Sequence, residues 1–360
     1  MKQQFVHCLF TVPIPDMTDL SGKEKTKDKN VLVIGGNGFL GCYIVRKFLK
    51  EGFKVTASYR KTPDPYLQHS LGQEVRWIPL DIQDIFALEE AMEGIDLVVN
   101  TAAIVSFDPS RKKEALTIGK EGTANIVNIA LEKGIKKCIH VSSVAAMGRK
   151  KPENFINEKE VFSHSAYDTH YGLSKFLAEQ EVWRAYFEGL PVTIISPSMV
   201  IGAGPWGQSS TSLFTSVYHG LKYYPQGVTG FVDVRDVADA VYLAMDEKMN
   251  GERFIISGEN LPFEEVLKKI SKSFNLNVMW KPLTPGLAAF AWRWSKLKSF
   301  FTGKPPVITS QNVISTATKS WYDNTKSKEI LGVEYRNLHE AIEESARLFL
   351  ISKEQFIMLD

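Results

Sequence analysis

The chain has 360 residues, 44% of them apolar, and a formal net charge of +2. This length allows one large core, or a nucleotide-binding domain with a smaller partner, and the near-neutral charge gives no reason to expect nucleic acid as a partner. No apolar run is long enough for a membrane span, and the three cysteines are too far apart for a metal or redox motif. We expect unpaired thiols in a reducing cytoplasm.

Residues 1–29 differ in composition from the rest of the chain. A mildly apolar stretch with two prolines runs to Asp16, and a polar, Lys-rich stretch follows it. The apolar centre is too short for a secretory signal. We therefore expect this segment to be a flexible N-terminal extension.

A glycine-rich turn follows the first clear strand pattern. Four apolar residues, Val31–Ile34, read as a buried strand, and apolar residues recur at helical spacing from Phe39 to Leu49. A strand, glycine turn and helix in this order form a dinucleotide-binding unit, because glycines let the backbone approach the pyrophosphate at the helix N-terminus. Two registers fit the glycines, Gly36-x-Gly38-x-x-Gly41 and Gly35-x-x-Gly38-x-x-Gly41.

Strand and helix patterns then alternate along the chain. Repeated βα units with nearly continuous apolar strands predict a doubly wound parallel sheet with helices on both faces. The expected strands are 54–58, 75–79, 97–102, 137–142 and 192–196, and the expected helices are 118–133 and 166–187.

The alternation stops near residue 197. Residues 202–207 read as a loop, residues 254–257 as a late strand, and 262–274 and 338–351 as helices. We therefore predict an α/β protein with a Rossmann dinucleotide-binding domain over 30–197, return strands near 230–257, and a smaller substrate-binding lobe mainly over 198–360. Ligands of such sheets bind at the carboxyl ends of the strands, where the lobe would cover them.

Tyr171 and Lys175 lie four residues apart on an expected helix, hence on one face. A cation beside a phenol favours the phenolate, which moves the tyrosine pKa toward working pH and suits acid–base chemistry. Three other Tyr-x-x-x-Lys pairs occur, starting at Tyr43, Tyr218 and Tyr322. Context favours Tyr171, because the strand 137–142 that precedes its helix ends in two serines.

With these motifs in place, the chain resembles the extended short-chain dehydrogenase/reductase family over about residues 30–350. The family's glycine signature matches the register of Gly35, Gly38 and Gly41, and its Tyr-x-x-x-Lys motif matches Tyr171 and Lys175. Ser143 matches the catalytic serine by its spacing to Gly148. Further matches are the acidic pair Asp81-Ile82, the strand end Asn100–Ala103, the segment Pro197–Gly202 and the segment Phe231–Ala238.

Two positions depart from the family pattern. Gly119 stands where many relatives have asparagine, a residue that supports the active-site helix. Ser196 stands where relatives commonly have arginine, which weakens the analogy to members that hold a nucleotide-sugar phosphate.

The resemblance implies hydride transfer. Tyr171 would exchange a proton with a carbonyl/alcohol pair, Lys175 would lower the tyrosine pKa and hold the nicotinamide ribose, and Ser143 would hydrogen-bond the reacting oxygen. No metal site is expected. The expected cofactor-binding residues are Gly35, Asn37, Gly38, Phe39, Leu40, Gly41, Arg60, Lys61, Asp81, Ile82, Thr101, Ala102, Ala103, Tyr171, Lys175, Pro197 and Val200. The expected substrate pocket contains Val105, Phe107, Val144, Met199 and Trp206.

The end of the second strand predicts a preference for NADP(H), with NAD(H) as the alternative. An NAD-selective enzyme usually has a carboxylate there to bind the ribose 2′-hydroxyl. Here Arg60 and Lys61 follow the strand, and no carboxylate occurs before Asp64. Both cations could hold a 2′-phosphate.

Three functions remain open. The first is an NADP(H)-dependent carbonyl reductase or alcohol dehydrogenase that acts on a small, apolar substrate, similar to the dihydroflavonol-reductase and 3β-hydroxysteroid-dehydrogenase groups. The second is a sugar epimerase or dehydratase. The third, a catalytically silent dinucleotide-binding module, is disfavoured because Ser143, Tyr171 and Lys175 are all present.

The segment from Leu287 to Phe301 interleaves aromatic residues with cations, a pattern found at membrane interfaces. We prefer to interpret it as a helix that covers the substrate pocket, with lysines on its outer face, over a peripheral membrane contact. Relatives often dimerise through two helices on a sheet face, so a homodimer is a further possibility.

Overall fold

The computed structural model of the chain describes residues 29–352, except 61, 63–69, 73, 106–107, 208 and 303–309. The predicted N-terminal extension therefore lies almost wholly outside the described residues.

A seven-stranded parallel sheet forms the centre of the larger part of the molecule, in the spatial order β3-β2-β1-β4-β5-β7-β11. The chain order reverses between β1 and β4, which makes a doubly wound sheet and creates a crevice at the carboxyl ends of these strands. The predicted fold class is confirmed. The strands are β1 (Asn30–Ile34), β2 (Lys54–Tyr59), β3 (Arg76–Pro79), β4 (Leu97–Asn100), β5 (Lys137–Val141), β7 (Val192–Pro197) and β11 (Glu252–Ile256).

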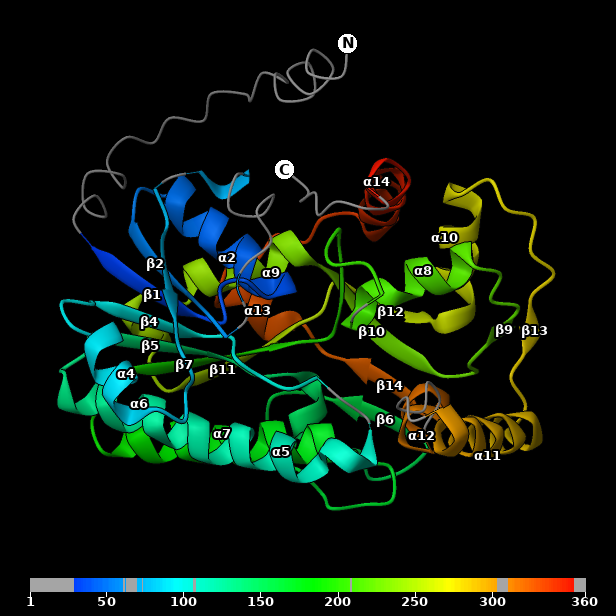
Figure 1. Cartoon of the computed structure of the whole chain (residues 1–360), viewed down its shortest axis with the longest axis horizontal. Coiled ribbons are helices and arrows are strands. Elements are labelled where there is room, and N and C mark those ends of the chain that lie inside the picture. The colour runs from blue at the N-terminus through cyan, green and yellow to red at the C-terminus, as the bar shows by residue number, and fades with distance from the viewer. Residues whose placement is uncertain are drawn as a thin grey trace, which may run out of the picture.

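Helices cover both faces of this sheet (Figure 1). On one face, α2 (Phe39–Lys50) and α9 (Val234–Leu243) bury a core with Val31, Val33 and Phe254. The other face buries Leu32, Val98 and Ile194. Because alternate residues of each strand point to opposite faces, both sets are apolar and the strands read as continuous apolar runs. The helices of the second face are α4 (Ile85–Ala91), α5 (Lys112–Thr117), α6 (Thr123–Glu132) and α7 (His170–Phe187), with a π-helical turn, η3 (Ile118–Gly122), between α5 and α6.

A second, mixed sheet supports the smaller lobe. Its path is β12-β10-β14-β6, with β8 paired to β10. Only β10 and β12 are antiparallel. The strands are β6 (Glu153–Ile156), β8 (Met199–Ile201), β10 (Val228–Asp233), β12 (Glu259–Pro262) and β14 (Lys319–Tyr322), and a separate pair joins β9 (Tyr223–Tyr224) to β13 (Lys281–Pro282).

The helices of the lobe enclose a third core around Phe214, Phe274 and Phe349. Contacts between aromatic rings hold it together, with ring centroids 5.3 Å apart for the tilted pair Phe274 and Phe349. The helices that contribute to this core are α8 (Ser212–Tyr218), α10 (Phe263–Ser273) and α14 (Leu338–Ile351). Further helices in this half of the chain are α11 (Pro285–Thr302), α12 (Ser310–Ala317) and α13 (Thr325–Glu329). Short 3₁₀ turns are η2 (Pro109–Arg111), η4 (Val144–Met147), η5 (Ser209–Thr211) and η6 (Glu247–Met249).

Strands from both sides of the predicted boundary at residue 197 contribute to each of the two main sheets. The late strand β11 returns to the large sheet beside β7, whereas β10 joins the small sheet. Conversely, β6 leaves the N-terminal half and pairs with β14. The helices α4 and α9 were not among the expected elements.

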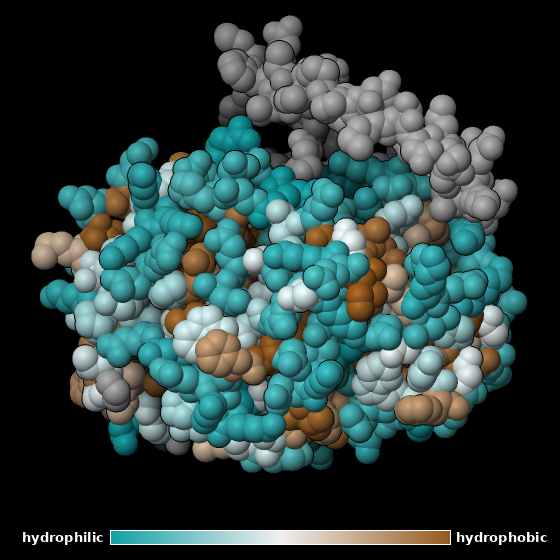
Figure 2. All heavy atoms as spheres, turned by 180° about the vertical axis from the view of Figure 1, so that it is seen from behind, coloured by the Kyte–Doolittle hydropathy of each residue, from teal (hydrophilic) through white to brown (hydrophobic). Residues whose placement is uncertain are grey.

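Polar side chains predominate on the face seen in Figure 2, with apolar side chains in small groups between them. In the part of the chain that the structure describes, no helix has both the length and the apolar content to cross a membrane. The segment that begins at Leu287 does form a helix, α11, but its outward side chains include Phe290 and Trp294, which are 65% and 61% exposed and stack on each other.

Candidate active site at the carboxyl edge of the large sheet

The glycine turn is fixed by backbone contacts that leave no space for side chains. Gly35 has a φ of +80°, and the Thr101 hydroxyl donates to the Ile34 carbonyl at 2.8 Å beside it. A Cβ at Gly41 would overlap the Gly35 carbonyl oxygen. Gly36 lies outside the register that matches the family signature, but a Cβ there would lie 2.8 Å from the Ala57 Cβ. Gly36 is therefore needed for packing against β2.

The N-terminus of α2 follows this turn directly. The first backbone N–H groups of any helix lack intrahelical acceptors. The N-cap of α2 is Gly38, which has no side chain that could accept from them. The Phe39 ring packs under the backbone of Gly202 and Gly204, and the Tyr43 hydroxyl donates to the Ala203 carbonyl at 2.8 Å. These contacts attach the loop after β8 to the dinucleotide-binding turn.

The end of β2 lies beside the same turn. The Ser58 hydroxyl accepts a hydrogen bond of 3.1 Å from the Gly35 N–H, a contact that was not expected from the sequence. Arg60 is exposed and follows the strand, while Lys61 lies outside the described residues. The structure thus offers one described cation, Arg60, at this strand end.

The ends of β3 and β4 complete the expected cofactor edge. Asp81 is exposed and caps its own turn through the N–H of Gln83 at 3.0 Å. Ile82 is buried against Gly122, where a Cβ would collide with it. At the end of β4, the Asn100 side chain accepts a hydrogen bond of 3.0 Å from the Ala102 N–H and so fixes the turn that follows the strand. Asn37, Leu40, Ala103 and Pro197 lie on the turns, helix start and strand ends of the same edge, whereas Val200 lies within β8 of the small sheet.

Ser143, Tyr171 and Lys175 meet where β5 ends and α7 begins. Ser143 lies two residues after the end of β5 and is the N-cap of η4, and its hydroxyl hydrogen-bonds the Tyr171 phenol. Thr169 caps α7 by accepting from the Gly172 N–H at 3.0 Å, so Tyr171 lies in the first turn. The Lys175 Nζ donates to the Val141 carbonyl at 2.8 Å, which ties the helix to the strand.

Burial controls the ionisation of this site in the cofactor-free protein. We expected a lowered tyrosine pKa, but burial raises the pKa of Tyr171, and the Ser143 hydrogen bond only partly opposes it. Burial also lowers the pKa of Lys175 to about 8, against the attraction of Glu179. Both shifts have one cause, because a poorly solvated site disfavours every charged form.

The two departures from the family pattern have different structural consequences. A Cβ at Gly119 would collide with Ser174, so the glycine lets η3 lie directly against α7. The Ser174 hydroxyl donates to the Ala115 carbonyl at 2.6 Å and fixes this contact. Ser196 is fully buried within β7, so its hydroxyl does not reach the surface of the lobe.

The expected substrate-pocket residues differ in their burial and in the residues that they contact. Val144 is buried in a small core with Tyr322, Val105 is 51% exposed, and Met199 is half-buried on β8. Phe107 lies outside the described residues. Trp206 packs edge-on against Phe349, and its Nε1 donates to the Ser352 hydroxyl at 3.1 Å. Trp206 thus packs between the 202–207 loop and α14, and its place in a substrate pocket stays a prediction.

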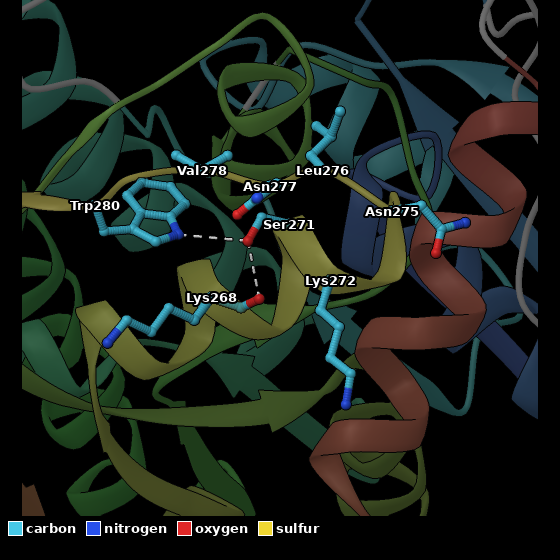
Figure 3. A pocket seen from close by; sticks show the side chains of 8 residues that line it. All are labelled: Lys268, Ser271, Lys272, Asn275, Leu276, Asn277, Val278 and Trp280. Atoms are coloured by element: carbon cyan, nitrogen blue, oxygen red, sulfur yellow. Dashed lines mark hydrogen bonds between the residues drawn. The ribbon is translucent and has the colours of Figure 1, made fainter.

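An open pocket of about 490 Å³ lies elsewhere, on α10 and the loop that follows it (Figure 3). Its floor is tied by hydrogen bonds, since the Ser271 hydroxyl donates to the Lys268 carbonyl at 2.9 Å and accepts from the Trp280 Nε1 at 3.4 Å. The Lys268 ammonium is paired with Glu264. None of the expected site residues lines this pocket.

Comparison with known proteins agrees with this geometry. The model of the NAD dependent epimerase/dehydratase family matches residues 31–257. Sterol demethylase protein B of Methylococcus capsulatus is 30% identical over 241 residues, which cover 66% of this chain and 72% of that protein. A putative dihydroflavonol 4-reductase of Synechocystis is 28% identical over 332 residues, which cover 88% of this chain and 93% of that one.

A solved structure extends the likeness to the whole fold. The UDP-glucose 4-epimerase of Thermotoga maritima, crystallised with UDP-glucose, superposes with a TM-score of 0.73 at 21% identity and covers 90% of this chain and 100% of that chain. A doubly wound sheet whose glycine turn, Ser, Tyr and Lys share one edge defines an extended short-chain dehydrogenase/reductase. The chain belongs to the NAD dependent epimerase/dehydratase family of these enzymes, whose cofactors are NAD(P)-type dinucleotides.

Proposed function

We propose that the protein is an NADP(H)-dependent carbonyl reductase that acts on a small, apolar carbonyl compound. The observation that carries this proposal is the cluster of Ser143, Tyr171 and Lys175, in which a hydroxyl bonds the phenol and an ammonium is fixed one helical turn away. These are the groups needed to donate a proton to a carbonyl oxygen and to stabilise the charge that develops on it.

The glycine turn fits a dinucleotide. The Gly35, Gly36 and Gly41 backbones are packed so closely that side chains are excluded, whereas Gly38 is exposed at the start of α2. The pyrophosphate would lie against Gly38 and the free N–H groups of the helix N-terminus. When bound, the reduced nicotinamide supplies a hydride to the carbonyl carbon.

The protein's own groups supply the rest of the reaction. The Tyr171 phenol gives its proton to the carbonyl oxygen, so that the carbonyl gains a hydride and a proton and becomes an alcohol. The Ser143 hydroxyl, already bonded to Tyr171, orients that oxygen. Lys175 holds the nicotinamide ribose and provides positive charge beside the phenol. The raised pKa of Tyr171 suits this direction, because a proton donor must be protonated at working pH.

Arg60 supports the choice of NADP(H). Its exposed guanidinium follows β2, next to Ser58, whose hydroxyl is bonded to the glycine turn. Ser58 is uncharged, and the described residues from Ser58 to Arg60 include no carboxylate that would repel a 2′-phosphate. A guanidinium can bind a phosphate through two parallel hydrogen bonds.

An apolar substrate is supported by the residues around the reacting groups. Val144 follows Ser143, and the strand-end segment after β4 exposes Val105. The buried Ser196 replaces a cation that would bind a nucleotide-sugar phosphate. The relatives named as a dihydroflavonol reductase and a sterol demethylase component point to the same chemical class of ring compounds.

The proposal is tested by incubating the protein with NADPH and a panel of aromatic and alicyclic ketones and aldehydes. We expect loss of absorbance at the nicotinamide band in a one-to-one ratio with alcohol product. An epimerase would convert a nucleotide sugar with no net change in that absorbance, and this result would contradict the proposal.

A further inference from the structure

The face of α7 that bears the site continues beyond Lys175. Glu179 follows Lys175 by four residues, as Lys175 follows Tyr171, so the three side chains lie along one face of the helix. Glu179 is 1% exposed and Lys175 is 5% exposed. A carboxylate this deeply buried is rare unless it is paired.

Arg253 is the partner of this carboxylate. Its Nη1 donates to the Glu179 Oε2 at 3.0 Å across the layer between α7 and β11. The same guanidinium also donates to the carbonyls of Glu158 and Glu160, which fixes its position. The Ser142 hydroxyl, which follows β5, also favours the charged form of this carboxylate. Burial raises the pKa of Glu179, and Arg253, Ser142 and Lys175 all oppose that shift and favour the charged carboxylate.

Other groups facing Lys175 from the sheet bring no second negative charge. His140 on β5 is buried, and its Nδ1 lies 3.2 Å from the Asn100 amide nitrogen. Burial and the nearby Lys175 keep the pKa of His140 well below 6.5, so this ring is neutral. Ser142 is a hydroxyl and the Tyr171 phenol is protonated. Among the described residues, Glu179 is the carboxylate whose attraction raises the pKa of Lys175.

We propose that Glu179 is a positioning residue of this site, whose carboxylate, anchored by Arg253, keeps the Lys175 ammonium charged. This inference rests on the proposed function in one respect, namely that Lys175 holds the cofactor. Burial has already lowered the pKa of Lys175 to about 8, so a small further decrease would make the neutral amine the main form at working pH. Loss of the carboxylate would lower that pKa further, and the group would become neutral at working pH.

The effect is measurable without catalysis, from the pH dependence of NADPH binding followed by nicotinamide fluorescence. In the parent protein we expect binding to weaken as the pH rises through about 8. In Glu179→Gln the midpoint should fall by about 0.5 to 1.5 pH units, since removal of a neighbouring charge shifts a buried group by about that much. In Glu179→Asp, which keeps the charge, the midpoint should stay within about 0.3 units of the parent value.

Further variants test whether the shift in midpoint arises from the interaction of Glu179 with Lys175. Glu181→Gln removes a carboxylate from the same helix that pairs with Arg184 at the surface, so it should leave the midpoint unchanged. In Lys175→Met the alkaline transition should be absent, and adding Glu179→Gln should change nothing further. The double variant Glu179→Gln/Arg253→Gln leaves no unpaired buried charge and should show a downward shift even if the single variant fails to fold.

The inference is overturned if the midpoint in folded Glu179→Gln, or in the double variant, matches the parent value. It is also overturned if Glu179→Asp and Glu179→Gln shift alike, which would indicate a packing role. If the parent binds NADPH but reduces no carbonyl compound, the proposed function fails, and the binding titration still decides the role of Glu179.

Discussion

Gly41 packs so closely on Gly35 that a Cβ at Gly41 would overlap the Gly35 carbonyl oxygen. Gly41→Ala must therefore displace either the turn or the first turn of α2. We expect the free energy of unfolding to fall by about 1–3 kcal/mol, as for overpacked cores, and NADPH binding to be lost. Urea unfolding and a fluorescence titration of the same sample measure both effects.

Gly38→Ala is the matched control within the same turn. A Cβ at Gly38 would be 3.2 Å from the Gly35 carbonyl oxygen, which is a tight but tolerable contact. It would lie at the exposed surface of the glycine turn, where the pyrophosphate is expected. We expect little loss of stability, less than about 1 kcal/mol, with clearly weaker NADPH binding. Equal losses of stability in the two variants would contradict this assignment of the glycines.

Tyr171→Phe removes the proposed proton donor. We expect kcat for carbonyl reduction to fall by about 10²- to 10⁴-fold, the usual contribution of a general acid, while NADPH binding changes little. Steady-state kinetics with a substrate from the ketone panel give the first quantity, and fluorescence titration gives the second. Unchanged turnover in Tyr171→Phe would remove Tyr171 from the mechanism.

Tyr43→Phe provides the comparison, because Tyr43 and Lys47 have the same spacing as Tyr171 and Lys175. The Tyr43 hydroxyl is buried and donates to the Ala203 carbonyl. Its removal should lower the free energy of unfolding by about 1–2 kcal/mol, because that carbonyl is left unpaired. Turnover per folded molecule should stay near the parent value.

Arg60→Ala tests the choice of cofactor. If Arg60 binds the 2′-phosphate, the dissociation constant for NADPH should rise by about 10- to 100-fold, the value of a charged hydrogen bond, and that for NADH should not change. Arg76→Ala, at the amino end of the neighbouring strand β3, removes an exposed cation on the opposite edge and should affect neither. Equal or tighter binding of NADH by the parent protein would reject the NADP(H) preference.

The buried Lys175 predicts a defined dependence of stability on pH. Its pKa is about 8 in the folded protein, against 10.5 for an exposed lysine. Between these values the unfolded chain binds more protons, so this group makes the folded state more stable as pH rises. Lys175→Met should therefore be more stable than the parent at pH 7, by up to about 3 kcal/mol.

That advantage should shrink as the pH rises from about 8 and should disappear above about pH 10.5, where the lysine is neutral in the unfolded chain as well. Urea unfolding of both proteins at pH 7 and pH 10 measures the difference. An advantage that does not change with pH would show that the methionine acts through packing alone.

The sequence predicted the parts of the fold that depend on local periodicity. The strand β1, the helix α2 and the helix α7 were expected within a few residues of their observed bounds, because apolar periodicity and glycines mark them locally. The second sheet was not expected. Its strands are short and only partly buried, and β14 pairs with β6 across 166 positions of the chain, which no local pattern records.

By itself, the sequence determined which family motifs are present: a glycine turn after a buried strand, and Ser143, Tyr171 and Lys175 in the order of the extended short-chain dehydrogenase/reductase family. Only the tertiary structure decided the electrostatic setting of these groups. Burial raises the pKa of Tyr171 and lowers that of Lys175, and Arg253, brought back by β11, fixes Glu179 behind them. Solvation depends on every layer that covers a side chain, and a linear pattern does not contain that information.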